Sequence, residues 1–270
     1  MPPPQRLPCF LATLVLYGCG PHEKQGTLQK AGARVKLNAY GEVHTVQYAY
    51  KAGVPHTLRT LPETVQVLDM QGTPVTPADI QAWSALPELH TLNLTDSGID
   101  ASAIPEISTI IKLEVLRLDG TPIQGPGLIE LRKLKKLHTL SLGNCKLLPD
   151  ALLQIAGLTQ LRSLSLQSTG LTDSDLAPLS DLNRLQWLWL SGNRITDRGI
   201  VHLSTLTKLR GLYLNHTNVS VNGLPSLQPL RQLETFWIVN RRLNHNHLTY
   251  LRDLLPEGCS INVRLPSSNP

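Results

Sequence analysis

The sequence predicts an α/β solenoid, in which a short strand, a turn and a short helix repeat along one elongated body. Three observations support this fold class. The pattern L-x-x-L-x-L recurs at an unvarying interval of 24 residues, with starts at Val65, Leu89, Leu113, Leu137, Leu161, Leu185, Leu209 and Leu233. The fourth, sixth and eleventh places of all eight units are apolar. Such a period identifies units that stack on one another and bury one continuous core.

The spacing of the apolar residues changes within each unit, and this change separates the strand from the helix. Places one, four and six point inward, whereas places three, five and seven point to the opposite face of the sheet. Further along, the interval becomes three, as at Leu176, Leu179 and Leu182, which is typical of the buried edge of a short helix. Several of these stretches contain proline, at Pro105, Pro149, Pro178, Pro225 and Pro229. Some convex segments are therefore expected to be single turns or 3₁₀ helices.

The ninth place of most units carries a small polar residue, such as Thr73, Thr121 or Asn193. These side chains are expected to hydrogen-bond the backbone where the chain leaves the strand. Cys145 occupies the same column, which predicts a structural role for it. Cys259 lies past the eighth unit, at roughly 20 Å by a strand spacing of about 4.8 Å, so the two thiols are too far apart for a disulfide.

The N-terminal segment has the layout of an export signal. Residues 9–17 form an apolar run that is too short to span a bilayer, and Gly18 and Cys19 follow it. Leu16-Tyr17-Gly18-Cys19 resembles the lipobox of bacterial lipoproteins, in which the cysteine is lipidated and becomes the mature N-terminus. Tyr17 departs from the small residue usual at its place, so a plain signal peptide that ends before Cys19 stays open. Both alternatives take the protein out of the cytoplasm.

The segments on either side of the array are expected to close its ends. Residues 33–39 and 43–48 alternate apolar and polar side chains, which indicates a hairpin. Residues 247–255 and 260–265 indicate a last helix and a strand that is out of register by one residue. The expected organisation is a signal peptide (1–18), a lipidated cysteine and tether (19–27), a hairpin with a degenerate first repeat (28–64), eight 24-residue repeats (65–256), a C-terminal capping strand (257–265) and a disordered tail (266–270).

In these features the chain resembles a leucine-rich repeat protein. Its helix-bearing units, with turns such as Gly72-Thr73-Pro74 and Gly120-Thr121-Pro122, are similar to the bacterial subfamily close to the ribonuclease-inhibitor type. The resemblance covers residues 43–265. It implies a curved horseshoe with a parallel sheet on the concave face, short helices or 3₁₀ turns on the convex face and, usually, a protein partner on the concave face. It does not identify that partner.

The sequence contains no G-x-S-x-G, no G-x-x-x-x-G-K-[ST] and no H-E-x-x-H motif. His245 and His247 have no neighbouring ligand residues, so a solvated pair is expected rather than a metal site. Asp96 and Asp119 are expected to form a wetted acidic rim, because nothing near them desolvates a general acid and base pair. The 25 basic and 20 acidic residues are interspersed without runs, which argues against a stripe that binds duplex DNA. We therefore expect no catalysis, metal, cofactor or nucleic-acid partner.

Aromatic residues gather at one end of the expected concave face. The fifth places of the last three units carry Trp189, Tyr213 and Trp237, and Trp187 lies at the third place of the sixth unit. The rings either stack as a ladder without further role, or they form an exposed apolar patch that marks an interface. We favour the interface.

Flanking residues complete this candidate site. Arg210, Asn215 and His216 are expected to form a polar rim around the rings, and Arg117 is a further candidate contact on the same face. The sequence thus predicts a non-catalytic binding scaffold of the cell envelope, held to a membrane by its lipid anchor, that recognises a protein on its C-terminal repeats. Two alternatives stay open. One is a glycan-binding module that uses the same rings, and the other is an enzyme assembled from scattered surface residues.

Overall fold

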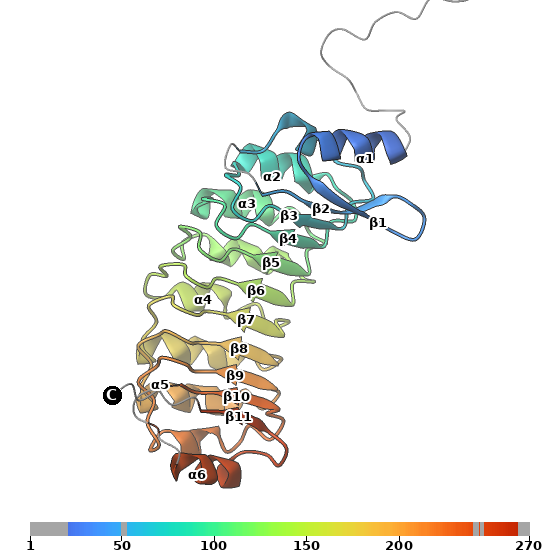
Figure 1. The fold of residues 1–270 in the computed structure, drawn as a ribbon. Coiled ribbons are helices and arrows are strands. Elements are labelled where there is room, and N and C mark those ends of the chain that lie inside the picture. Colours follow the sequence, from blue (N-terminus) through green and yellow to red (C-terminus); the bar gives the residue numbers. More distant parts are fainter. Residues whose placement is uncertain (1–20, 50–52, 240–242, 244–245, 264–270) are drawn as a thin grey trace, which may run out of the picture.

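The computed structural model describes residues 21–49, 53–239, 243 and 246–263. It contains one 11-stranded sheet whose strands follow the order of the sequence (Figure 1). The strands are β1 (Arg34–Leu37), β2 (Val43–Gln47), β3 (Val67–Asp69), β4 (Thr91–Asn93), β5 (Val115–Arg117), β6 (Thr139–Ser141), β7 (Ser163–Ser165), β8 (Trp187–Trp189), β9 (Gly211–Tyr213), β10 (Thr235–Trp237) and β11 (Ser260–Asn262). β1 and β2 pair antiparallel, and every later pair is parallel.

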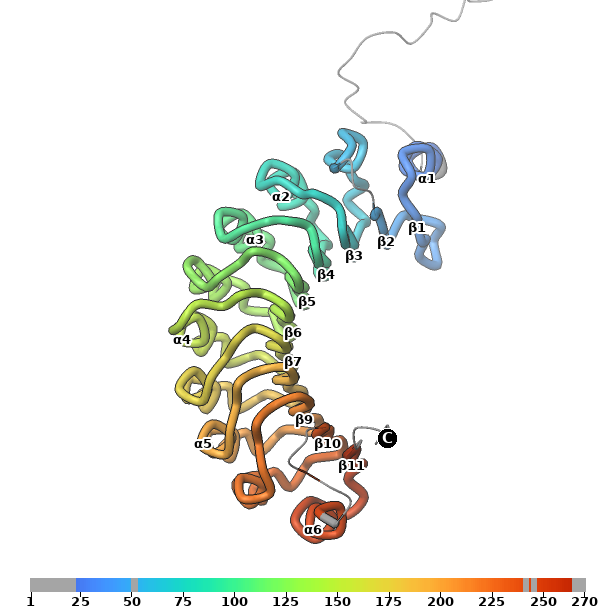
Figure 2. The backbone as a smooth tube through the Cα atoms, turned by 60° about the vertical axis from the view of Figure 1, so that its left-hand side comes forward, coloured from blue at the N-terminus to red at the C-terminus, as the bar shows by residue number. Residues whose placement is uncertain are grey.

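Helical segments lie on the outer side of the arc and the strands lie on its inner side (Figure 2). The α-helices are α1 (Pro21–Lys30), α2 (Pro77–Ser84), α3 (Ile104–Ile107), α4 (Ala151–Ile155), α5 (Asp197–Ile200) and α6 (Asn246–Leu254). The 3₁₀ helices are η1 (His56–Leu58), η2 (Ala101–Ala103), η3 (Leu128–Lys133), η4 (Asp173–Asp181), η5 (Val201–Thr205) and η6 (Leu224–Leu227). Pro178 lies inside η4, and Pro225 is the second residue of η6. The predicted mixture of short helices and 3₁₀ turns is therefore confirmed.

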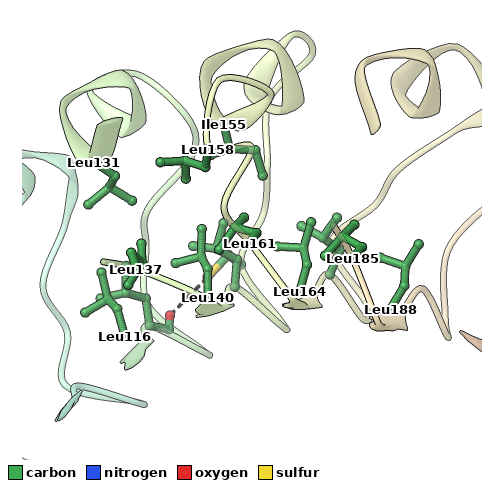
Figure 3. Packing of buried hydrophobic residues seen from close by; sticks show 14 of the residues in the cluster. Leu116, Leu131, Leu137, Leu140, Ile155, Leu158, Leu161, Leu164, Leu185 and Leu188 are labelled. Atoms are coloured by element: carbon green, nitrogen blue, oxygen red, sulfur yellow. Dashed lines mark hydrogen bonds between the residues drawn. The ribbon is translucent and has the colours of Figure 1, made fainter. Parts of the chain in front are cut away.

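The repeat places fall where the sequence puts them. The pairing joins residues one repeat apart, as Leu164 with Leu188 and Leu188 with Leu212. These fourth-place side chains are fully buried, and so is the sixth-place Leu190. Figure 3 shows how the leucines of successive units stack into a continuous core. Because each buried leucine contributes about 1.5–3 kcal/mol, the apolar columns fix the register of the sheet.

Most ninth-place side chains in the described residues bind the backbone at the ends of the strands, as predicted, whereas the buried hydroxyl of Ser97 has no hydrogen-bond partner. The Oγ1 of Thr169 donates a hydrogen bond to the carbonyl oxygen of Leu166 at 2.7 Å, and the Nδ2 of Asn193 donates to the same oxygen at 2.7 Å. Cys145 is fully buried and its Sγ donates to the carbonyl oxygen of Leu118 at 3.2 Å. Burial raises the pKa of this thiol. Cys145 therefore fills space and satisfies a carbonyl, which is a structural role.

The start of the described chain differs from the expectation. The sequence predicts a polar tether over residues 19–27, whereas residues 21–27 belong to helix α1. The tether prediction is wrong for these residues, because Leu28 is 3% exposed and docks the helix on the core. The hairpin of β1 and β2 follows α1, with Val35 opposite Val46. The predicted signal peptide and Cys19 lie outside the described residues.

Helix α6 and strand β11 close the other end of the array. β11 pairs in parallel with β10 and places Ile261 opposite Phe236. This interval is one residue longer than the repeat, so β11 is out of register by one, as expected. β11 is shorter than the capping strand predicted over 257–265. Residues 264–270, which include the predicted disordered tail, lie outside the described residues.

Candidate binding site on the concave face

Three neighbouring strands, β8, β9 and β10, carry aromatic side chains on the concave face. The register places Trp189 opposite Tyr213 and Tyr213 opposite Trp237. The ring centroids of Trp189 and Tyr213 are 5.2 Å apart with an interplanar angle of 11°, and those of Tyr213 and Trp237 are 5.7 Å apart at 55°. Trp187 stacks on Trp189 at 6.3 Å and 20°. We call these four residues the aromatic strip.

Gly211 makes room for one ring of the strip. It lies opposite Trp187 in the sheet, and a Cβ at this position would overlap the ring of Trp187. The third place of the other seven units carries a side chain, so the missing side chain of Gly211 serves the close approach of Trp187. Gly211 is not among the site residues predicted from the sequence. The available signal was a glycine that falls one repeat after a tryptophan in the same column.

The stacked rings bury part of one another and leave an apolar surface open. Trp187, Trp189 and Tyr213 are half-buried, and Trp237 at the end of the strip is 39% exposed. Burial raises the pKa of the Tyr213 phenol, which stays neutral over a wide pH range. The strip therefore presents a neutral, apolar surface of the kind that accepts the side chains of another molecule.

The predicted polar rim lies at the two ends of the same strands. Arg210, just before β9, places its Nε 3.0 Å from Oε1 of Glu234. The Oδ1 of Asn215 accepts a hydrogen bond from the backbone N–H of Val239 at 2.9 Å, which joins two repeats. His216 is exposed and adopts a left-handed backbone with φ 55°. The three residues flank the strip as expected, but Arg210 and Asn215 also have partners within the chain.

Arg117 belongs to a different part of the concave face. It lies on β5, three strands before Trp189, and both residues line one shallow hollow of about 410 Å³. The floor between them carries Ser141 on β6 and Ser165 on β7. The hydroxyl of Ser141 donates a hydrogen bond to Oδ1 of Asp119 at 2.5 Å. Arg117 is thus part of a polar half that adjoins the aromatic strip.

The other candidate residues take positions in turns. The Oδ1 of Asp119 also accepts a hydrogen bond from the backbone N–H of Gly143 at 2.8 Å, and Asp96 adopts a left-handed backbone. Among the described residues, no group of three or more His, Cys, Asp and Glu side chains is arranged to hold a metal ion. His245 lies outside those residues. No helix in the described part of the chain is both long enough and apolar enough to cross a membrane.

Replacing Gly211 with alanine is expected to displace the ring of Trp187. The new methyl group overlaps that ring, and relief of such overpacking costs typically 1–3 kcal/mol. Near-UV circular dichroism, which reports the coupling of stacked aromatic rings, should change. Ser163→Ala is the matched control, because Ser163 lies opposite Trp187 on the other side, in β7. An unchanged aromatic spectrum in Gly211→Ala would mean that the ring does not lie over Gly211.

Comparison with known proteins supports the fold. Residues 184–206 match the profile of the family described as Leucine Rich Repeat. None of the curated protein sequences compared with the chain matches it. The structure is similar to that of an internalin C2 from Listeria monocytogenes, with a TM-score of 0.52 and 20% identity over 82% of this chain and 81% of that chain.

Two further solved structures are similar over much of the chain. An internalin (inlF) from Listeria monocytogenes has a TM-score of 0.45 and 17% identity, over 93% of this chain and 95% of that chain. The plant peptide hormone receptor RGFR1, in complex with RGF2, has a TM-score of 0.45 and 20% identity, over 76% of this chain and 37% of that chain. The predicted leucine-rich repeat solenoid is confirmed as the fold.

Proposed function

We propose that the protein is a non-catalytic binding scaffold, which holds a protein partner on the concave face of its C-terminal repeats. The aromatic strip carries this proposal. Four large rings lie on neighbouring strands, and the last of them is 39% exposed. Aromatic side chains at the centre of an interface commonly supply most of its binding free energy. The parallel sheet holds the rings rigidly, so little entropy is lost when a partner binds.

The geometry of the rings favours a protein partner over a glycan. Sugars stack on open ring faces, but the faces of Trp189 and Tyr213 are turned toward each other at 5.2 Å and 11°. The surface that stays open consists mainly of ring edges, which suit aliphatic and aromatic side chains. Trp237 is tilted by 55° against Tyr213, so a glycan that stacks on Trp237 is the second candidate.

Affinity capture from envelope extracts tests the proposed function. The wild type is compared with a variant that combines Trp189→Ala, Tyr213→Ala and Trp237→Ala. A matched variant with Ser141→Ala and Ser165→Ala alters the same column in the polar half of the concave face. We expect the wild type and the matched variant to retain a protein that the first variant loses. Equal capture by all three would contradict the proposal.

Competition separates the two ligand classes. Hydrophobic peptides should displace a protein partner from the strip, whereas cell-wall fragments should displace the protein from a glycan. Displacement by cell-wall fragments alone would favour the glycan-binding alternative.

The proposed location is the cell envelope, with a lipid anchor at Cys19. Its support is the sequence Leu16-Tyr17-Gly18-Cys19 after an apolar run of nine residues. An anchor at this point would leave the whole solenoid outside the membrane, with its concave face accessible.

Cys19→Ala is expected to abolish the incorporation of labelled fatty acid, because a single residue carries all the acyl chains. The variant should stay unprocessed or become soluble in the envelope fraction. Cys9→Ala is the matched control and should keep the label, since Cys9 lies at the start of the apolar run. A wild type that fractionates with membranes but carries no labelled lipid would contradict the lipid anchor.

A further inference from the structure

The loops that lead into strands β6 to β10 bring exposed basic side chains to one edge of the solenoid. Each loop supplies at least one of them: Lys135 and Lys136 before β6, Arg162 before β7, Arg184 before β8, Lys208 before β9 and Arg231 before β10. We call these six residues the basic edge. Backbone hydrogen bonds link the loops, as from the N–H of Arg162 to the carbonyl oxygen of His138 at 2.8 Å. The 24-residue period thus brings charges that are scattered in the sequence to one edge.

The charges of successive repeats act on one another along this edge. Glu88 lies two repeats before Lys136. The hydrogen bond and the charge of Lys112 lower the pKa of the Glu88 carboxyl, and the charge of Lys136 lowers it further. Because neighbouring strands are about 4.8 Å apart, the basic edge extends over roughly 20 Å.

Most acidic residues of this edge are paired with other cations. Glu88 pairs with Lys112 at 2.8 Å, and Glu234 pairs with Arg210 at 3.0 Å. Across the part of the chain that the structure describes, no ion pair involves any of the six residues of the basic edge. Asp181, at the end of η4, is an acid on this side that likewise has no ion pair there. Glu114, just before β5, lies 3.6 Å from Nε2 of His138, which carries a charge only when it is protonated. Six cations without an ion pair, set against these two acids, leave the edge positive.

The opposite edge, where the chain leaves the strands, uses its acids inside the fold. Asp173 accepts a hydrogen bond from the backbone N–H of Thr196 at 2.7 Å, and Asp197 accepts one from the N–H of Ser220 at 2.6 Å. Each of these bonds joins two repeats. The opposite edge therefore combines exposed cations, at Lys146, Arg194 and Arg198, with acids that hold neighbouring repeats together. The basic edge carries mainly cations without an acidic partner.

An exposed aliphatic side chain accompanies the cations. Ile111, in the loop before β5, is 67% exposed, the highest value for an aliphatic residue in the described part of the chain. The loops of the basic edge carry no Trp, Tyr or Phe, so the bases of a single-stranded nucleic acid would find no ring to stack on. Cations beside an aliphatic group fit a bilayer surface, where the charges meet headgroup phosphates and the aliphatic group enters the acyl boundary.

We propose that the basic edge docks on the surface of a bilayer that contains anionic lipids. The strands then run away from the bilayer, because the edge lies at their starts. The concave face stands upright on the membrane, and the aromatic strip stays open to its partner. This docking is separate from the proposed anchor at Cys19, since an acyl chain enters a bilayer of any charge, whereas the basic edge responds to anionic lipids.

Sedimentation with lipid vesicles tests the docking on the full chain. The vesicles contain phosphatidylcholine alone or mixed with phosphatidylglycerol. One variant combines Lys136→Gln, Arg162→Gln and Lys208→Gln on the basic edge. The matched variant combines Lys146→Gln, Arg194→Gln and Arg198→Gln, which removes the same charge from the exposed residues of the opposite edge. Both variants are also made with Cys19→Ala, so that the anchor and the edge are measured separately.

The basic-edge variant is expected to lose about a hundredfold of its phosphatidylglycerol-dependent partition, because each of the three removed cations contributes roughly fivefold near an anionic surface. The matched variant should keep the wild-type partition, and the difference should persist with Cys19→Ala. Equal loss in both variants would assign the effect to net charge and overturn the proposal. Unchanged partition in both variants would also overturn the proposal, and so would a difference between them that vanishes with Cys19→Ala.

Discussion

Replacing Leu188 with aspartate is expected to unfold the sixth repeat together with the units that pack on it. Leu188 is fully buried between Leu164 and Leu212 of the neighbouring strands. Loss of a buried leucine side chain costs about 2–5 kcal/mol, and burial of an unpaired carboxylate costs several more. The sum is comparable to the typical 5–15 kcal/mol of a whole domain. Urea unfolding followed by far-UV circular dichroism should show a large fall in the midpoint or a second transition.

Ser165→Asp is the matched control for this change. Ser165 lies on β7, next to β8, but at the fifth place, which faces the concave side and is half-buried. A carboxylate there keeps contact with water, so the free energy of unfolding should change by about 0.5 kcal/mol or less. Both variants introduce a carboxylate on neighbouring strands, but on opposite faces of the sheet. Equal unfolding midpoints would mean that the fourth place does not point into the core.

The fold was predictable because one pattern is repeated eight times. A single leucine such as Leu188 says little about its surroundings, but the same place is buried in every unit, as at Leu92 and Leu140. The interval of 24 residues then fixes which residues pair across strands, since a slip of one residue would turn the leucines to the concave side. Strand pairing and burial both follow from this one constraint. The direction of curvature was implied by the resemblance to leucine-rich repeat proteins.

Helix α1 escaped prediction because it has no repeat behind it. Its sequence, PHEKQGTLQK, is polar and contains Gly26 in its interior, and over residues 23–30, whose side chains the structure describes, only Leu28 is buried. A helix of ten residues with this composition has little stability in isolation, so contact with the core holds it in place. The local sequence shows that the segment is polar, but it does not show the core surface on which Leu28 packs.

For the candidate site, the repeat places of the aromatic residues could be predicted from the sequence, but their side-chain contacts could not. The 24-residue interval places Trp189 beside Tyr213, and in the structure their ring centroids are 5.2 Å apart. The repeat pattern does not reveal that the ring of Trp187 lies over Gly211. It also does not reveal that the amide oxygen of Asn215 accepts a hydrogen bond from the backbone of the next repeat. Such details depend on rotamers and on neighbours one repeat away, which a pattern of residue types does not encode.

The distribution of charge on the surface was also not apparent from the order of residues along the chain. Along the sequence the basic residues form no run of five or more, which argued against a stripe that binds duplex DNA. In the structure the period brings Lys136, Arg162 and Lys208 to one edge, while the carboxylates of Asp173 and Asp197 turn inward to the backbone of the next repeat. Charge patterning in a repeat protein therefore has to be counted by column rather than along the chain.

Trp189→Ala is expected to weaken the binding of the captured partner by about thirtyfold or more. Trp189 lies between Trp187 and Tyr213 in the strip, and truncation of a central interface aromatic commonly costs at least about 2 kcal/mol. The ring is only half-buried, so the free energy of unfolding should fall by less than the roughly 3–5 kcal/mol of a core aromatic. Isothermal titration measures the affinity, and urea unfolding measures the stability of the same variant.

The controls for Trp189→Ala are changes at the fifth place of other repeats, on the same concave face. Ser141→Ala and Ser165→Ala change the polar half of the concave face and should leave the affinity nearly unchanged. Trp237→Ala should weaken binding as Trp189→Ala does, because Trp237 is the most exposed ring of the strip. If both tryptophan variants bind the partner as tightly as the wild type, the rings are a stacking ladder that only stiffens the sheet. The binding site would then lie elsewhere, along Arg117 and Asp119 or on the helical face.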